Sequence, residues 1–506
     1  MKSLKNWLFK NKWLLLGSLA IITIDYFYLN KIFSLHFVDE EDNFVLGHFL
    51  LQGQKLYSDL FSHHQPLGYI MSAALQLVVD PQNIEMLVSR HRQFMILYSV
   101  AWSLILIWRF RERIIPPLIV FEASKFFLLG SHFLSESLAV YPVLYLVLFL
   151  LESRKPKTFE FFVSGLLISF SAFMLAPAWP MLAAYLILLI WIKRAGVKEF
   201  ISIVAGGLIP LLISLPFLDV YYYFRNVFYI NFKYYIPQSG EEGLPMALIK
   251  SFFSPLTALM TPSSLESSGT IQKIASLLLI LSSVFLVKMK QYKALAIALI
   301  LLTFSNIRYF SPGLEYFSGF HILSWYAILL VISFYFIPEI TEKYKKLRTF
   351  LVALVVVVIL ISLYSSNQLF EKRDMQHDYY VNYSEFYAYG EAIKSMRDED
   401  DTLFVIPDAW LLYFQGDVKN NNKMVNFYGW MQLVWELNDP VVEKFKSSPP
   451  EFFYCDCDPK LVEFYSGGYT QMVRDGAKTK LWVLNTKYNS LTEEQKNKLR
   501  FFNFQF

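Results

Sequence analysis

The chain has 506 residues, of which 55% are hydrophobic and 18% aromatic, and its formal net charge is +4. The hydrophobic share exceeds the ~45–50% that is usual in soluble domains, so the composition argues against an ordinary soluble protein. Two cysteines exclude a disulfide scaffold and a cysteine-rich metal site.

Apolar runs near the length of ~20 residues that crosses a bilayer recur along the first three quarters of the chain. The first run is predicted to stay uncleaved, because no small-residue cleavage site follows it. We predict eleven membrane-spanning helices, at about 13–33, 92–109, 114–130, 137–151, 159–175, 178–192, 200–217, 271–287, 294–310, 318–337 and 349–366.

Clusters of Lys and Arg between these runs predict the orientation. Six clusters, from the lysines near the N-terminus to Arg348, fall on one side if the eleven spans alternate. The positive-inside rule then places the N-terminus in the cytoplasm and the C-terminus outside. The same rule accounts for the basic residues, so we expect no nucleic acid as a partner.

One apolar stretch, Leu67–Val79, is too short for a span at thirteen residues and is bounded by Pro66 and Asp80. We predict an interfacial or re-entrant helix there. The first outer loop then runs over residues 34–91 and lies on the membrane surface.

The composition becomes polar after Ser366. We predict a helix at 385–398 and buried strands at 402–407 and 480–485, which together indicate a small α/β domain. The expected organisation is a transmembrane module, 1–366, and an extracytoplasmic domain, 367–506.

Four consecutive carboxylates, Asp39–Asp42, open a predicted helix directly after the first span. An apolar face continues this helix, and Gly53 is well placed to end it. Acidic residues at a helix start favour the helix dipole, and Glu41 and Asp42 do not need any further role. His63 and His64 follow before Pro66, where plain surface residues at a turn are the alternative.

This loop resembles the first outer loop of GT-C fold membrane glycosyltransferases, in the branch of protein O-mannosyltransferases and aminoarabinose transferases. The family pattern is an Asp-Glu pair after the first span, a helix that ends in Gly, then an aromatic-x-Asp element and a Pro-rich "PPL-x-Y" element. Asp39-Glu40, Gly53, "LYSD" at 56–59 and "HHQPLGYI" at 63–70 match it. Gln65 departs from the pattern, because the family usually has Pro there.

The resemblance implies an α-helical GT-C fold and inverting transfer of a sugar from a polyprenyl-phosphate donor to an acceptor glycan, lipid or protein. It further implies a bacterial inner membrane and outer-face catalysis. Asp39 matches the catalytic Asp, expected to act as general base, with Glu40 as its neighbour. Glu136, in the short outer turn before the fourth span, is expected to orient the acceptor.

The leaving phosphate needs cationic or hydrogen-bonding groups on the outer side. The candidates for contacting the donor are His63, His64, Tyr57, Arg308, Tyr309 and, more weakly, His321. For Arg308 the alternative is an arginine that reaches the bilayer interface.

A divalent metal held by Asp39, Glu40, Glu136 and His64 is a further hypothesis, although their spacing is not diagnostic. Glu122 and Lys125 are expected to form a structural ion pair. Cys455 and Cys457 are either oxidised to each other or two thiols.

Three other classes stay open at this point. A lipid-linked sugar flippase or transporter would show internal repeats and polar residues at mid-bilayer, neither of which is clear in this sequence. An O-antigen ligase would rely on arginines of its outer loops. An inactive relative that serves as an assembly partner is the third.

Overall fold

A computed structural model describes residues 9–236, 267–305, 320–335 and 373–505, together with some residues of 6–7 and 246–256. The chain forms two compact units, each built from three separate stretches. The bundle unit comprises Met1–Ile32, Arg92–Ile213 and Glu241–Arg373, and the sheet unit comprises Phe33–His91, Ser214–Gly240 and Asp374–Phe506. The predicted division into 1–366 and 367–506 stays a prediction.

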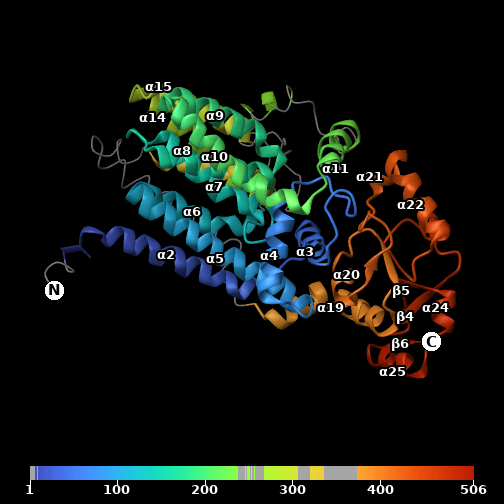
Figure 1. Ribbon diagram of the computed structural model, residues 1–506. Coiled ribbons are helices and arrows are strands. Elements are labelled where there is room, and N and C mark those ends of the chain that lie inside the picture. Colours follow the sequence, from blue (N-terminus) through green and yellow to red (C-terminus); the bar gives the residue numbers. More distant parts are fainter. Residues whose placement is uncertain are drawn as a thin grey trace. The chain divides into compact units, whose positions relative to one another are not determined.

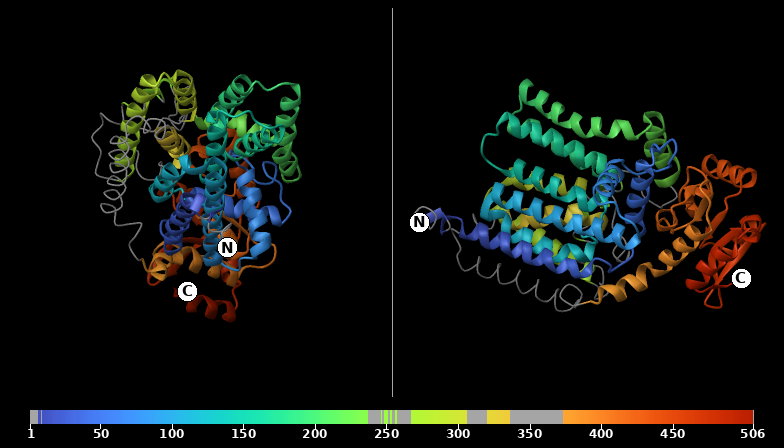
Figure 2. Two further views of the ribbon diagram at one scale, coloured as in Figure 1. Left: turned by 90° about the vertical axis from the view of Figure 1, so that its left-hand side faces the viewer. Right: turned by 60° about the horizontal axis from the view of Figure 1, so that its bottom comes forward.

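The bundle unit consists of helices that run side by side (Figures 1 and 2). Apolar side chains suit these helices to lipid, where a helix satisfies every backbone hydrogen bond within itself. They are α2 (Lys12–Tyr28), α5 (Ile84–Phe110), α6 (Ile115–Ser124), α7 (Ser135–Leu151), α8 (Thr158–Met174), α9 (Trp179–Lys193), α10 (Val197–Ser214), α14 (Ser267–Lys288), α15 (Tyr292–Ser305) and α16 (Leu323–Tyr335). Short helical turns connect some of them, namely η1 (Leu29–Lys31), η2 (Arg111–Ile114), η3 (Lys125–Leu128) and η4 (Ala176–Ala178), whereas η5 (Leu215–Phe217) belongs to the second stretch of the sheet unit.

Helices occupy ten of the eleven predicted spans, and the eleventh, 349–366, lies outside the described residues. Four described helical stretches are long and apolar enough to cross a membrane: Lys12–Lys31, Ile84–Leu128, Ala176–Lys193 and Val197–Phe217. The other apolar stretches are shorter, as in Ser276–Lys288 of α14, so the number of spans stays a prediction. The helix that contains the second predicted span, α5, starts at Ile84, earlier than the predicted span start near residue 92.

A buried ion cluster joins helices inside the bundle unit. The Lys125 ammonium lies 2.9 Å from an Asp25 carboxylate oxygen and also contacts Glu122, as predicted for that pair. The Glu122 carboxylate accepts hydrogen bonds from Ser103 and Tyr141, both at 2.8 Å. Apolar surroundings make such groups stable only when they are paired, so the cluster holds α2, α5, α6 and α7 in one arrangement.

The sheet unit begins with α3 (Val38–Leu51) and the thirteen-residue α4 (Leu67–Val79), which pack against each other. The predicted apolar face of α3 is buried, and Gly53 follows the helix with φ +87, a conformation that favours glycine. The Gln76 side chain of α4 donates to the Phe44 carbonyl at 2.7 Å and fixes this pair.

The second stretch of the sheet unit contains α11 (Val220–Phe224) and a π-helix, η6 (Arg225–Tyr235). The third begins with α19 (Met375–Met396) and continues with α20 (Leu411–Gly416), α21 (Gly429–Gln432), α22 (Trp435–Ser447), α23 (Pro459–Tyr465), α24 (Asn485–Asn489) and α25 (Glu493–Phe501). π-helical turns are rare and frequently lie at functional sites.

A six-stranded mixed sheet organises this third stretch, with the strand order β2-β1-β3-β5-β4-β6. β1 is parallel to β2 and β3, and the remaining pairs are antiparallel. The strands are β1 (Thr402–Ile406), β2 (Lys419–Asn420), β3 (Phe452–Cys455), β4 (Tyr469–Arg474), β5 (Ala477–Leu484) and β6 (Phe504–Gln505). The predicted α/β architecture and both predicted strands are therefore confirmed, and a disulfide joins Cys455 to Cys457.

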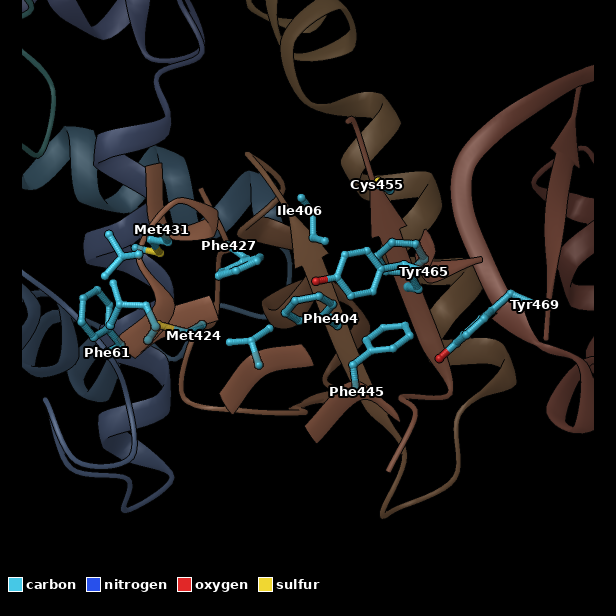
Figure 3. Close-up of a cluster of buried hydrophobic side chains, with 14 of the residues drawn as sticks. Phe61, Phe404, Ile406, Met424, Phe427, Met431, Phe445, Cys455, Tyr465 and Tyr469 are labelled. Carbon is cyan, nitrogen blue, oxygen red and sulfur yellow. The ribbon is translucent and has the colours of Figure 1, made fainter. Parts of the chain in front are cut away.

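One hydrophobic core joins the three stretches of the sheet unit (Figure 3). Phe61 from the first stretch and Ile230 from η6 belong to the same buried cluster as Phe404 of β1 and Phe453 of β3. The Phe61 amide also donates to the Lys423 carbonyl at 2.7 Å. The predicted outer loop and the C-terminal strands thus form one folded body.

Candidate active site

Three of the four predicted carboxylates, Asp39, Glu40 and Glu41, lie in the first turn of α3. The residue before the helix is Phe37, which has an extended backbone and makes no side-chain capping hydrogen bond. The three carboxylates lie at the positive end of the helix dipole, which favours their charge. At 100° per residue, Asp39 and Asp42 share a face of α3 that differs from the faces of Glu40 and Glu41.

Burial separates Asp39 from the other three carboxylates. Glu40 and Glu41 are each 1% exposed and Asp42 is 7% exposed, whereas Asp39 is only half-buried. Glu41 contacts the His36 ring, a residue that the sequence did not single out. Burial raises the pKa of Glu41, and the neighbouring His36 acts in the opposite direction.

Asp42 holds the histidine loop in place. One of its carboxylate oxygens accepts a hydrogen bond from the Tyr69 hydroxyl at 2.8 Å and lies 3.2 Å from Nδ1 of His64. The Ser62 hydroxyl links the two partners, because it lies 2.7 Å from the Tyr69 oxygen and accepts from the His64 amide at 3.0 Å. Asp42 thus has a role beyond the helix dipole: it orients the imidazole of His64.

Other stretches of the sheet unit support the same loop. The Asn231 amide of η6 donates to the His63 carbonyl at 2.8 Å, and the buried Tyr57 hydroxyl donates to the His64 carbonyl at 3.0 Å. The His63 ring packs against the rings of Tyr235 and Trp430. Tyr57 thus supports the loop, and its predicted contact with substrate stays a prediction. Both histidine rings are only half-buried.

The C-terminal part of the chain contributes two site residues that sequence reasoning missed, Asp408 and Tyr428. Asp408 follows the carboxyl end of β1, the edge at which parallel strands usually present their functional residues. Desolvation by the surrounding protein raises the pKa of Asp408, and the negative charge of Asp39 raises it further. The two carboxylates therefore share one electrostatic environment. The signal that could have found Asp408 is an acidic residue directly after a buried strand.

Tyr428 lies in the same environment. Burial raises its pKa well above the usual value, and the charges of Asp42, Asp39 and Asp408 add to that effect. Its hydroxyl therefore stays protonated, and its oxygen accepts a hydrogen bond from the Trp410 indole at 3.3 Å.

Glu136, the other predicted catalytic residue, lies in the bundle unit in the first turn of α7. It lines a small cavity, as does His321. The described lining also includes Ser305 and Ser324 and the apolar residues Leu175, Pro177, Ala178 and Met181. The structure thus brings together two candidates that are 185 positions apart in the chain.

Two predicted phosphate contacts, Arg308 and Tyr309, lie outside the described residues. Within the described ranges, no three His, Cys, Asp or Glu side chains are arranged to hold a metal ion. Carboxylate and imidazole groups of the loop bind one another instead, as in the pairs Asp42–His64 and Glu41–His36. The metal hypothesis stays a prediction, and we derive no step through a metal.

No protein-family model matches the chain, and no curated protein matches its sequence. Among solved structures it is similar to ArnT from Cupriavidus metallidurans bound to undecaprenyl phosphate. The TM-score is 0.51 at 11% sequence identity, and the match covers 94% of this chain and 98% of that chain. This likeness, together with the apolar helices and the C-terminal sheet, confirms the expected architecture: the chain is a membrane protein with the GT-C fold.

Proposed function

We propose that this protein is an inverting glycosyltransferase, which moves a sugar from a polyprenyl-phosphate donor to an acceptor at the outer face of a bacterial inner membrane. The observation that carries the proposal is the state of the four carboxylates at the start of α3. Three of them are buried, and only Asp39 of these four keeps partial access to solvent. A general base must reach the proton of its acceptor, so Asp39 is the member of this group that fits the role.

The fold supports the choice of donor. The solved structure of ArnT, whose fold extends over nearly the whole of this chain, contains undecaprenyl phosphate. Fold alone does not establish an activity, which depends on the residues of the site. Here the same helix carries the partly accessible Asp39 and, one turn later, Asp42, which contacts His64 of the histidine loop. Asn231 and Tyr57 also hold this loop in place.

In the proposed reaction, an acceptor hydroxyl loses its proton to Asp39 while its oxygen attacks the anomeric carbon. The bond between that carbon and the phosphate oxygen breaks, and polyprenyl phosphate leaves with the electron pair. His63 and His64, together with Arg308 and Tyr309, are proposed to stabilise the charge on the leaving phosphate. Glu136, with His321 in the same cavity, is proposed to orient the acceptor.

The test is turnover of a panel of polyprenyl-phosphate sugars by the purified protein and by Asp39→Asn. Because a general base contributes ~10²–10⁴-fold, kcat should fall by at least ~10²-fold in the variant. Asp80→Asn is the matched control, since Asp80 is an exposed carboxylate in the same loop with φ +48, a conformation that asparagine tolerates.

Full activity in Asp39→Asn would show that another group is the base. Binding of a lipid-linked sugar without any turnover would instead favour a flippase or an assembly partner. A parallel assay with a chelator tests the metal hypothesis.

A further inference from the structure

Three polar groups of the C-terminal part lie together, two of them interact electrostatically with Asp39, and the proposed mechanism does not use them. They are the Asp408 carboxylate, the Asn426 side-chain amide and the Tyr428 hydroxyl. Asn426 and Tyr428 lie on the segment after β2, which passes beside β1: Asn426 bridges to Val405, and the Phe427 amide donates to the Val405 carbonyl at 3.1 Å. The group therefore lies at the carboxyl end of β1, where open α/β sheets bind ligands.

The buried side chain of Asn426 indicates that this group binds a ligand. Its side chain is 2% exposed, and its Oδ1 accepts the Asp408 amide at 3.1 Å. Its Nδ2 has no hydrogen-bond partner among the described residues. This Nδ2 faces the Asp408 carboxylate and lowers its pKa, but it lies outside hydrogen-bond geometry. A buried amide donor without a partner is destabilising, so binding of a ligand group that accepts its hydrogen bond is favoured.

The other two groups complement this donor. Asp408 is exposed to solvent, so its carboxylate can accept hydrogen bonds from a ligand. The Tyr428 oxygen already accepts from Trp410, while its proton has no acceptor among the described residues. Two donors thus stand beside one charged acceptor. Neighbouring hydroxyls match this set, since a hydroxyl donates to a carboxylate and accepts from an amide or a phenol.

We propose that Asp408, Asn426 and Tyr428 form a hydroxyl-binding subsite, through which the C-terminal part of the chain binds the sugar ring beside Asp39. The inference rests on the proposed function and deepens it, because it assigns the C-terminal part a share in substrate recognition. The ring belongs either to the donor or to a glycan acceptor, two sources with the same chemistry.

The experiment compares Asp408→Asn and Tyr428→Phe with the wild type in steady-state kinetics, varying donor and acceptor in turn. A hydrogen bond to a charged group accounts for roughly 10–100-fold in affinity, so KM for one of the two substrates should rise by about that factor in Asp408→Asn. Tyr428→Phe should raise the same KM, by about 10-fold or less, and kcat should stay near the wild-type value in both variants. The substrate whose KM changes identifies the ring that is bound.

Matched controls are Asp475→Asn, an exposed aspartate whose φ of +52 is positive like the +68 of Asp408, and Tyr380→Phe, an exposed tyrosine. Thermal unfolding verifies that each variant stays folded, and equilibrium binding of the donor and of a glycan acceptor gives a readout without turnover. Unchanged KM and unchanged binding for both substrates would overturn the subsite while the proposed function stands. A fall in kcat at constant KM, with a shifted pH profile, would also overturn it, because Asp408 would then act on the charge of Asp39, His36 or Asp456. A wild-type protein that neither binds nor turns over any donor would overturn both proposals.

Discussion

Single side chains of the sheet unit decide how its segments are held together, and Glu436 is the clearest case. This carboxylate of α22 accepts hydrogen bonds from Tyr234 at 2.5 Å and from Tyr229 at 3.0 Å. The Lys233 ammonium lies 3.0 Å away and Arg225 lies at 3.3 Å. All four partners come from η6, so one residue of the C-terminal part fixes the π-helix that supports the histidine loop.

We expect the contacts between Glu436 and η6 to weaken in acid. The pKa of Glu436 is lowered from its usual 4.5 to about 2, chiefly by the hydrogen bond from Tyr234. A carboxyl with a lowered pKa contributes stability above the unfolded value, and that stability is lost as the pH falls from about 4.5 towards about 2. Glu436→Gln should therefore be less stable than the wild type at pH 7, with a difference that shrinks by pH 3.

Unfolding by denaturant at the two pH values measures this effect. Glu443→Gln, which changes an exposed carboxylate of the same helix, is the control. If the free energies of unfolding of wild type and Glu436→Gln differ equally at pH 7 and pH 3, the contacts of Glu436 with η6 do not depend on its ionisation.

Helices α8 and α10 pack with their backbones in close contact. The neighbouring glycines Gly206 and Gly207 of α10 differ in how near they lie to α8. A Cβ on Gly206 would lie 2.0 Å from the Phe162 carbonyl oxygen of α8, and a Cβ on Gly165 would lie 1.9 Å from the Ile203 carbonyl oxygen. Small residues allow membrane helices to approach in this way. At Gly207, by contrast, a Cβ would meet its nearest atom only at 3.6 Å.

Gly206→Ala should therefore separate α8 from α10 and lower the free energy of unfolding by about 1–3 kcal/mol. Gly207→Ala should stay close to the wild type, since its methyl group makes an ordinary contact. Thermal unfolding in detergent compares the two. Equal stability of both variants would contradict the close helix contact.

The whole molecule is not folded in the order of its chain. Residues 33–91 and 214–240 share a compact unit with the C-terminal part, and Phe61 lies in the same core as β1. The site combines segments from all three stretches of this unit: Asp39 from the first, Asn231 from the second and Asp408 from the third. A substitution in the first stretch should therefore lower the stability of the third stretch.

Phe61→Ala tests this cooperativity. The side chain is 4% exposed, so its removal leaves a cavity that costs about 3–5 kcal/mol. Amides of β1, more than 300 positions away in the sequence, should then exchange hydrogen faster. Phe224→Ala, at a side chain that is 56% exposed, should leave this exchange unchanged. Unchanged protection of β1 in Phe61→Ala would mean that the loop and the sheet unfold independently.

Local chemistry determined much of this architecture from the sequence alone. Apolar runs of about twenty residues predict membrane helices, because a helix satisfies its backbone hydrogen bonds within lipid. Short apolar runs predict the buried strands β1 and β5. The helix of Asp39 and its end near Gly53 also follow from periodicity and from glycine's tolerance of positive φ. The ion pair of Glu122 and Lys125 is predictable, because a helix places residues three apart on one face.

Only the tertiary structure decided which polar residues meet. No periodicity relates Asp408 or Tyr428 to Asp39, because their proximity depends on how a sheet at the end of the chain packs on a helix near its start. The same packing buries Glu40 and Glu41, binds Asp42 to His64 and leaves Asp39 accessible, so four adjacent carboxylates that look alike in the sequence have different environments. Burial and long-range contact are properties of the folded chain, and they separate the proposed base from its neighbours.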